Sequence, residues 1–512
     1  MMEKPVSAFD ALIVGYGPVG AMMAGLLANR GWRVAVVDRL GDVYPLPRAV
    51  RFDGEAMRLF QELGIAGEME RDSTPIRGGE FVDAHFNRLE GAELPDGFLT
   101  PLGWPLGFMF HQPTLERALR RRVAAFDGVT VFTSHEAGPP REGDDYVEID
   151  VTPVDGGPSQ TLRGSYLIAA DGAASPTRKA IGASFLSLGY DCDWVVVDVL
   201  LTKPVPALSP LVQQICDPAR VVTFVPVVGE RRRWEFRLNP GEVRQEMVAP
   251  DKIWAMLAPW VTPDVAVIER AADYQFHAAI ADRWRKGRVF LAGDAAHQTP
   301  PFLGEGMCAG LRDAASLAWK LDHVKRGLAG EALLDTYQQE RGPHALDLVD
   351  HAVATGKLMD QIAAAQKGGA WPTSYAAAYG GERGFPHLHT GVLALTEDDP
   401  TDFVTGYQCP QPRVEMGDGP VLLDDALPAE FCLISARDVS DLLCAGDEAL
   451  LAHLECRRVI LAPSQRLSPE LDELLAENDA IIVRPDRYVF GVANARVSLR
   501  EQLAKLRSHY SL

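Results

Sequence analysis

The sequence has few cysteines and no long apolar segment. Its 512 residues include seven cysteines, an odd number, with no Cys-x-x-Cys pair and no cysteine–histidine cluster at metal-ligand spacing. This composition excludes a disulfide framework, and we expect no metal site and a reducing, cytoplasmic location. No stretch approaches the roughly 18 uncharged apolar residues that span a bilayer, so we expect no membrane partner.

Positive charge is also scarce. Lys and Arg together number 50 and Asp and Glu 70, which gives a formal net charge of −20. A surface this acidic repels phosphate backbones and anionic lipid, so nucleic acid is not an expected partner. Hydrophobic residues make up 47% and charged residues 23%, a composition typical of a folded globular chain.

A glycine-rich turn near the N-terminus predicts dinucleotide binding. Strands are expected at Phe9–Val14 and Trp32–Asp38, with a helix over Pro18–Arg30 between them. The connecting sequence is Gly15-Tyr16-Gly17-Pro18-Val19-Gly20. Gly15 permits a tight turn, Gly17 lets a pyrophosphate approach the backbone, and Gly20 allows close helix–strand packing.

The same unit supplies polar groups for a nucleotide. The helix that Pro18 and Val19 open offers N–H donors and a partial positive charge. At the end of the second strand, Asp38 can accept a hydrogen bond from a ribose hydroxyl, with Arg39 beside it. No second fingerprint of this kind is present, so we expect one permanently bound dinucleotide, and any second one must bind without a dedicated domain.

Two further turns follow predicted strands. Asp294, after Gly293 at the end of a strand, can bind a polyol hydroxyl. The loop from Pro301 through Gly304 gives a rigid backbone beside a flat ligand, and the helix that begins near Gly306 and Met307 can stabilise negative charge on it. Asp171 and Gly172 form the third turn, after the predicted strand 161–170.

The three turns, in this order, resemble the motifs of single-component FAD-dependent aromatic hydroxylases with the para-hydroxybenzoate hydroxylase fold. Further segments resemble the subgroup of 3-(3-hydroxyphenyl)propionate hydroxylases, and the similarity covers residues 8–360. These segments are Tyr44–Val50, Phe110–Glu116, Leu291–Lys320 and Leu334–Tyr337 with Glu340 and Arg341. Arg51 and Glu305 depart from the subgroup, where histidine and glutamine are usual, and these charge changes put the substrate assignment in doubt.

The resemblance implies an α/β fold of three parts. A Rossmann-like FAD-binding domain comprises residues 1–183 and 281–365, and a β-rich substrate domain of residues 184–280, with part of 75–110, is inserted in it. A linker at 366–394 leads to a small thioredoxin-like domain at 395–512, which lacks a Cys-x-x-Cys pair.

The resemblance also implies a reaction. NADH or NADPH reduces the FAD, dioxygen adds at the flavin C4a atom, and the resulting hydroperoxide passes its distal oxygen to a small phenolic substrate. A phenol suits this reaction because its deprotonated form is the better nucleophile, so a nearby base would help. A product catechol from 3-(3-hydroxyphenyl)propionate is the expected outcome, and a homodimer is left open.

Site residues follow from the same resemblance. Arg48 is expected near the pyrophosphate or the ring, Gln112 beside the cofactor, and Pro301 along the ring. The base is not identified by the sequence, and its candidates are His111, Tyr190, His277 and His297. Arg51 and Arg237, or Arg233, are candidates to contact the substrate.

Three alternatives remain open. One is a hydroxylase of a polycyclic or heteroaromatic phenol in natural-product tailoring. Another is a Rossmann dehydrogenase that binds NAD without a flavin, although such an enzyme does not need the polyol site at Asp294. The third is a flavin-bound interaction or redox-sensing module without turnover. Bound yellow FAD, and NADH consumption stimulated by a phenol, separate them.

Overall fold

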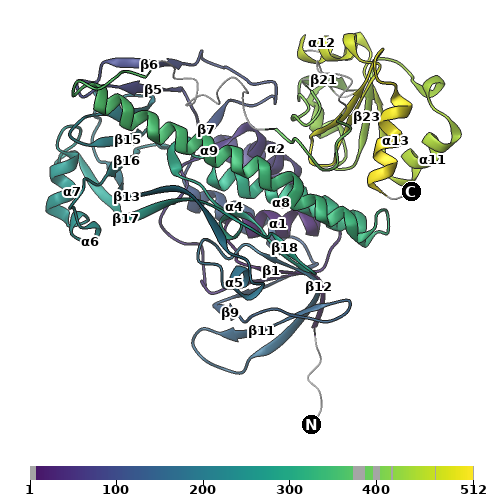
Figure 1. The fold of residues 1–512 in the computed structure, drawn as a ribbon, viewed down its shortest axis with the longest axis horizontal. Coiled ribbons are helices and arrows are strands. Elements are labelled where there is room, and N and C mark those ends of the chain that lie inside the picture. Colours follow the sequence, from purple (N-terminus) through teal and green to yellow (C-terminus); the bar gives the residue numbers. More distant parts are fainter. Residues whose placement is uncertain (1–6, 373–386, 396–403, 417–418, 467–468, 511–512) are drawn as a thin grey trace.

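A parallel sheet forms the first part of the molecule (Figure 1). The computed structural model describes residues 7–372, 387–395, 404–416, 419–466 and 469–510. The parallel strands lie in the order β19-β12-β1-β2-β8. Their bounds are β1 (Ser7–Val14), β2 (Val34–Asp38), β8 (Val129–Thr133), β12 (Gln160–Ala169) and β19 (Val289–Leu291).

Helices and short antiparallel strands complete this part. The expected strand–turn–helix–strand unit is present, and Asp53 accepts a hydrogen bond from Ala56 N at the start of the helix that begins at Gly54. The helices are α1 (Pro18–Asn29), α2 (Gly54–Glu62), α3 (Ala66–Arg71), α4 (Gln112–Ala124), α5 (Pro176–Ala180) and α8 (Gly306–Lys325). The antiparallel strands are β3 (Arg51–Asp53), β4 (Thr74–Pro75), β7 (Gly107–Met109), β9 (His135–Ala137), β10 (Arg141–Glu142), β11 (Val147–Pro153) and β18 (Arg285–Lys286).

An eight-stranded, mostly antiparallel sheet forms the second part, in the order β20-β17-β13-β16-β15-β14-β5-β6. Its strands are β5 (Gly78–Val82), β6 (Arg88–Glu93), β13 (Phe185–Leu201), β14 (Val212–Cys216), β15 (Val221–Val225), β16 (Arg231–Arg237), β17 (Ala266–Ala281) and β20 (His297–Gln298). One face packs against α7 (Pro250–Leu257), preceded by α6 (Arg244–Met247). The two early strands β5 and β6 therefore join a sheet built mainly from residues after 184.

A long helix links the first two parts. The sequence predicts separate helices at 334–341 and 344–359, but α9 (Thr336–Ala365) runs continuously through Pro343. Tyr337 and Leu348, on either side of the proline, are both buried, so packing outweighs the hydrogen bond that the proline removes. Near its C-terminal end, Gln366 donates a hydrogen bond to Cys216 O of the eight-stranded sheet, at 2.6 Å.

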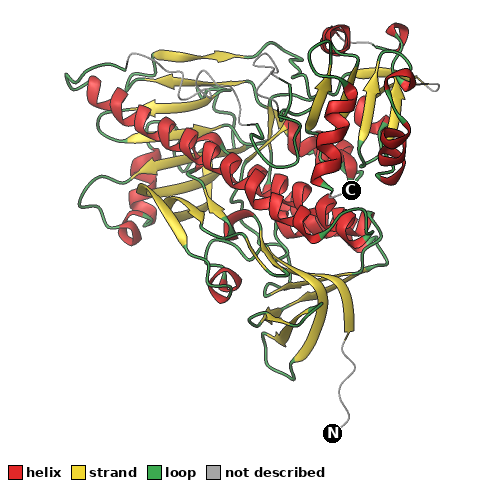
Figure 2. Cartoon of the chain, turned by 45° about the vertical axis from the view of Figure 1, so that its right-hand side comes forward, coloured by secondary structure: helices red, strands yellow, loops and turns green. Residues whose placement is uncertain are grey.

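A small α/β unit forms the third part, and Figure 2 shows its strands flanked by helices. Its sheet has the order β24-β23-β25-β26, with β23 parallel to β24 and antiparallel to β25. This is the βαβ-α-ββα arrangement expected of a thioredoxin-like unit. The elements are β21 (Arg413–Met416), β22 (Gly419–Leu422), α10 (Leu423–Ala426), β23 (Cys432–Ser435), α11 (Ala445–His453), β24 (Arg457–Ile460), α12 (Pro469–Glu477), β25 (Ala480–Val483), β26 (Val489–Ala493) and α13 (Leu499–His509).

Buried polar contacts fix this unit to α8 and α9. Trp319 donates to Asp486 at 3.0 Å, and Arg484 pairs with Glu340 at 2.7 Å. The expected linker at 366–394 lies in part outside the described residues. Within the described ranges, every helix is too short or too polar to cross a bilayer.

Candidate active site

A cavity of about 360 Å³ lies where the loops of the parallel sheet meet the eight-stranded sheet. Two sides of the cavity are named by the residues that form them. The glycine wall consists of Gly17, Gly172, Gly304 and Gly306, and the sheet wall consists of Val212, Thr223, Val225, Arg233 and Glu235. The other lining residues include Arg48, Arg51, Asp294, Pro301, Phe302 and Met307.

The glycine wall is open backbone. A Cβ atom added to Gly17, Gly172 or Gly306 would meet no other atom within 4 Å. Gly15 has a φ of 101°, and a Cβ on it would lie 2.2 Å from Ala170 O, so this turn lies directly against the residue that follows β12. A Cβ on Gly20 would collide with Gly15 O in the same way. The two predicted glycine roles, close packing and free approach of a ligand, thus fall on different residues of one turn.

Asp294 lines the cavity in the short turn that follows β19, and its side chain is exposed there. Among the described residues, no donor lies within hydrogen-bond distance of its carboxylate. Desolvation by the surrounding protein raises the pKa of Asp294 above its ordinary value, and His297 and Arg48 only partly offset this. An unpaired carboxylate beside three open glycine backbones fits a ligand that has both a polyol chain and phosphates, as FAD does.

Gln112 orders the chain segment that contains Arg48. Its side-chain oxygen accepts hydrogen bonds from the backbone N–H groups of Arg48, at 3.0 Å, and Ala49, at 2.6 Å. Its amide nitrogen donates to Glu116 at 2.7 Å. Gln112 lines the cavity, as predicted, but its polar atoms hold protein groups. The Arg48 side chain stacks on Tyr44 and faces the cavity.

On the sheet wall, a buried arginine is held by four hydrogen bonds within the protein. Arg233 on β16 donates to both carboxylate oxygens of Asp198 on β13, at 2.7 and 3.0 Å. It also donates to Arg48 O, at 2.6 Å, and Pro47 O, at 3.1 Å. Arg270 on β17 lies 3.4 Å from the same Asp198. Arg233 therefore joins the sheet to the Arg48 segment, and four of its five N–H donors are used within the protein.

Glu235 lies two residues further along β16, on the same face of the sheet. It is buried, with 5% of its surface exposed, and it lines the cavity. Burial raises the pKa of Glu235 to about 7, because Arg233 and Arg270 compensate only part of the cost and Asp198 adds to it.

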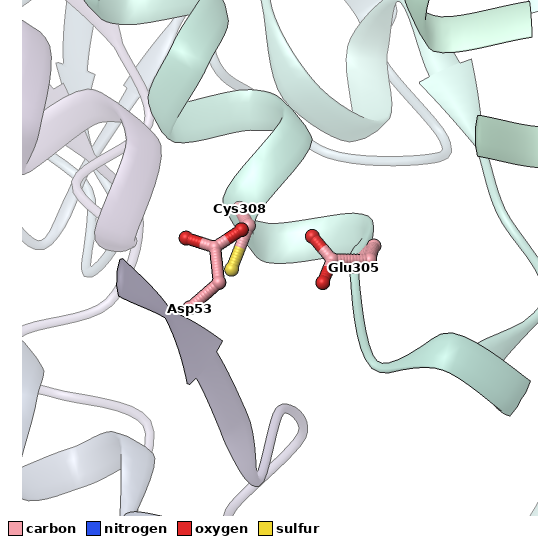
Figure 3. A group of neighbouring side chains, drawn as sticks. All are labelled: Asp53, Glu305 and Cys308. Atoms are coloured by element: carbon pink, nitrogen blue, oxygen red, sulfur yellow. The ribbon is translucent and has the colours of Figure 1, made fainter. Parts of the chain in front are cut away.

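A second group of acidic side chains lies behind the glycine wall. Figure 3 shows Asp53, Glu305 and Cys308 side by side, an arrangement that could hold a metal ion. Two arginines take this place: Arg312 pairs with Asp53 and Glu305, and Arg51 pairs with Glu305. Although burial works against it, these arginines hold the pKa of Asp53 below its ordinary value. The two charge changes noted in the sequence, Arg51 and Glu305, therefore form one ion pair.

The cavity brings together most of the predicted cofactor residues. Those that line it are Gly17, Pro18, Val19, Arg48, Gln112, Gly172, Asp294, Pro301, Gly304, Gly306 and Met307. Gly15, Gly20, Asp38, Arg39, Asp171 and Gly293 are not among the lining residues. Asp38 accepts hydrogen bonds from Tyr16 N, at 2.6 Å, and Leu40 N, at 2.7 Å, so it shapes the turn.

The candidate bases lie outside the cavity. His277 is exposed and pairs with Asp191, and His297 is buried against Asp313 at 2.8 Å. His111, at the start of α4, contacts Thr114 at 3.1 Å, and burial lowers its pKa. Tyr190 packs edge-on behind Phe302, with ring centroids 6.0 Å apart. Of the two predicted substrate residues, Arg51 lines the cavity, whereas Arg237 pairs with Asp360 outside it.

Comparisons with known proteins agree with this site. Residues 8–352 match the FAD binding domain family, and residues 406–509 match the HcaD C-terminal domain family. The fold, the cavity and these matches define an FAD-dependent oxidoreductase.

Similar proteins narrow the class. A Rhodococcus jostii protein named "probable NADH-specific resorcinol 4-hydroxylase" is 34% identical over 96% of this chain and 93% of that protein. A Burkholderia cenocepacia 3-(3-hydroxy-phenyl)propionate/3-hydroxycinnamic acid hydroxylase is 33% identical over 94% and 93%. The chain belongs to the family of FAD-dependent aromatic hydroxylases.

Solved structures share the whole fold. The flavin-dependent monooxygenase PieE, in complex with FAD and substrate, has a TM-score of 0.84 and 22% identity, with 99% of this chain and all of that chain covered. Aklavinone-11 hydroxylase, with FAD and aklavinone, has a TM-score of 0.81 and 25% identity, with both chains fully covered. The expected fold class is confirmed.

The sequence did not identify two polar residues of the sheet wall, Thr223 and Glu235, as candidates. The alternation of Arg233, Trp234, Glu235 and Phe236 was a usable signal, because residues two apart on a strand share a face. If Arg233 faces the cavity, Glu235 faces it too.

Proposed function

We propose that the chain hydroxylates a small, uncharged phenol of the resorcinol type, with NADH as the reductant. The observation that supports this most is the charge of the sheet wall. The arginine of this wall, Arg233, is bound to Asp198 and to two backbone carbonyls, and the other ionisable group of the wall is Glu235. A substrate carboxylate placed there would meet repulsion rather than a partner.

The residues present fit FAD and would divide the work between the walls. When bound, FAD would accept electrons from the nicotinamide cofactor and activate dioxygen. Asp294 would accept hydrogen bonds from the ribityl hydroxyls, and the backbone at Gly17 and Gly306 would approach the phosphates and the ring. Val212, Val225 and Phe302 would exclude water from the space where the phenol is held.

3-(3-Hydroxyphenyl)propionate is a second candidate, because a relative of similar identity is named for it. Its carboxylate would have to face away from the sheet wall, toward Arg48. Among the described residues, Arg48 is the cavity-lining arginine that pairs with no carboxylate. A larger polycyclic phenol is the remaining alternative.

A direct assay tests the proposal. The FAD-loaded protein is incubated with NADH and either resorcinol or 3-(3-hydroxyphenyl)propionate, and products are identified by mass spectrometry. We expect resorcinol to gain one oxygen atom, with NADH consumed in equal amount and NADPH used poorly. Oxygenation of the propionate alone would favour the second candidate, and NADH consumption that yields only peroxide with both would reject the proposal.

A further inference from the structure

We infer that Glu235 is the catalytic base that accepts the proton of the substrate's phenolic hydroxyl. The inference rests on the proposed function, since it needs a phenol in the cavity. None of the histidines or tyrosines expected to act as a base lines the cavity, so the position has to be filled by another group.

Glu235 differs from its buried acidic neighbours because, among the described residues, it accepts no hydrogen bond and its ion pair with Arg233 is long. Asp198 accepts two hydrogen bonds from Arg233, at 2.7 and 3.0 Å, and Asp313 accepts one from Arg341, at 2.9 Å. Glu305 forms ion pairs with two arginines. The closest cation to Glu235 is Arg233, and its Nη1 atom lies 3.8 Å from Oε1, beyond hydrogen-bond distance. In the part of the chain that the structure describes, no donor bonds to the Glu235 carboxylate. Because Glu235 lines the cavity, a ligand bound there can supply the hydrogen-bond donor that the protein does not.

The strand register turns Glu235 toward the cavity. Glu235 lies opposite Thr223 on β15 and Val196 on β13, and Trp234 and Phe236 point to the other face, into the core beside α7. Thr223 donates its hydroxyl proton to Gln214 at 2.7 Å. The proton acceptor that this row of the sheet wall can offer a phenol is therefore the Glu235 carboxylate.

The charged groups around Glu235 set its proton affinity near neutrality. Arg233 on its own strand and Arg270 on β17 favour the ionised form, whereas Asp198 on β13 and burial disfavour it, and the pKa is raised to about 7. From β15, the facing side chain is the uncharged Thr223. A general base works best when its pKa lies close to the working pH, and a pKa of about 7 places Glu235 in that range.

The other carboxylate of the cavity, Asp294, is on the opposite side. It lies in the short turn after β19, next to the glycine wall, where a polyol chain would engage it. The two carboxylates thus serve different ligands, the cofactor and the substrate.

The proton transfer balances within the site. The phenol O–H bond breaks, a bond forms between that proton and a Glu235 carboxylate oxygen, and the electron pair stays on the phenolate oxygen. Negative charge moves from the glutamate to the ring, which becomes the stronger nucleophile toward the oxygen that the bound cofactor supplies. No additional oxidant or reductant is needed.

The test compares hydroxylation of phenols with decreasing pKa, made by adding fluorine atoms to resorcinol. Wild type, Glu235→Gln and Glu269→Gln are loaded with FAD, and product formation is measured with NADH at pH 7 and at a series of lower and higher pH values. Glu269 is the matched control, because it lies on the same sheet and pairs with Arg231 at 3.2 Å but does not line the cavity. Flavin absorbance shows that each variant is folded and loaded.

We expect Glu235→Gln to hydroxylate resorcinol about 100-fold more slowly than wild type, and this deficit to shrink to a few-fold as the phenol becomes acidic enough to ionise unaided. The loss of rate at acidic pH, with its midpoint near 7 in wild type, should disappear in the variant. Glu269→Gln should follow wild type with every phenol.

Two failures are distinguishable. If wild type oxygenates none of the phenols, the proposed function is wrong. If wild type oxygenates them and the Glu235→Gln deficit is absent, or is the same for every phenol, the proposed function stands and Glu235 is not the base.

Discussion

The two walls of the cavity are built in opposite ways. The glycine wall presents main chain, with open space beside Gly17, Gly172 and Gly306, and Asp294 lines the same cavity. The sheet wall presents side chains on neighbouring strands, where Arg233 is held by hydrogen bonds and Glu235 accepts none from the described residues. Backbone positions a ligand that the whole family shares, whereas side chains can change with the substrate.

The largest effect should come from the sheet wall. Arg233→Met leaves the buried Asp198 carboxylate with only Arg270 beside it, and removes the bonds to Pro47 O and Arg48 O. We expect the free energy of unfolding to fall by about 3–5 kcal/mol. Urea unfolding of the FAD-loaded protein measures this, and Arg231→Met, at a half-exposed pair, is the control, with a loss below about 1 kcal/mol. Equal losses would show that Arg233 has no special role.

The second effect sharpens the contrast through pH. The pKa of Glu235 is about 7 in the folded chain, against an ordinary value of 4.5, so the folded state holds this proton to higher pH than the unfolded state does. Its contribution to stability is therefore full below pH 4.5 and is lost as pH rises to 7. Above pH 7, we expect Glu235→Gln to be more stable than wild type by about 3 kcal/mol. A wild type and variant that keep the same difference in urea midpoint from pH 5 to 8 would contradict the assignment.

The glycine wall should respond in cofactor binding rather than in folding. Gly17→Leu places a side chain in the open space of the wall, and we expect FAD to bind about 100-fold more weakly. Gly330→Leu is a close control, because Gly330 also precedes a helical turn with a similar backbone conformation and open surroundings but does not line the cavity. FAD titration by fluorescence decides. Similar affinities in the two variants would place the cofactor elsewhere.

The smallest effect should come from Asp294. Asp294→Ala removes the acceptor for the polyol chain but leaves the glycine wall intact, so we expect FAD affinity to fall roughly tenfold. Equilibrium dialysis after mild removal of FAD measures it. An FAD dissociation constant equal to that of wild type would show that Asp294 does not hold the ribityl chain.

The same contrast explains how much the sequence predicted. The glycine turns were predictable because their spacing follows from one ligand, and Gly17, Gly172 and Gly306 do meet at one cavity. The sheet wall was not, because which face of β16 is covered by α7 depends on distant strands. Arg51 and Glu305 illustrate the limit: each stood out alone as an unusual charge, but their pairing joins residues 254 positions apart.

The most direct measurement is a crystal structure of the FAD-loaded protein with a bound phenol. The account predicts the ribityl chain against Asp294, the flavin along Gly304–Met307, and the phenolic oxygen within hydrogen-bond distance of Glu235. A flavin away from Gly17, Gly172 and Gly306, or a phenolic hydroxyl that faces Arg48 instead of Glu235, would contradict it.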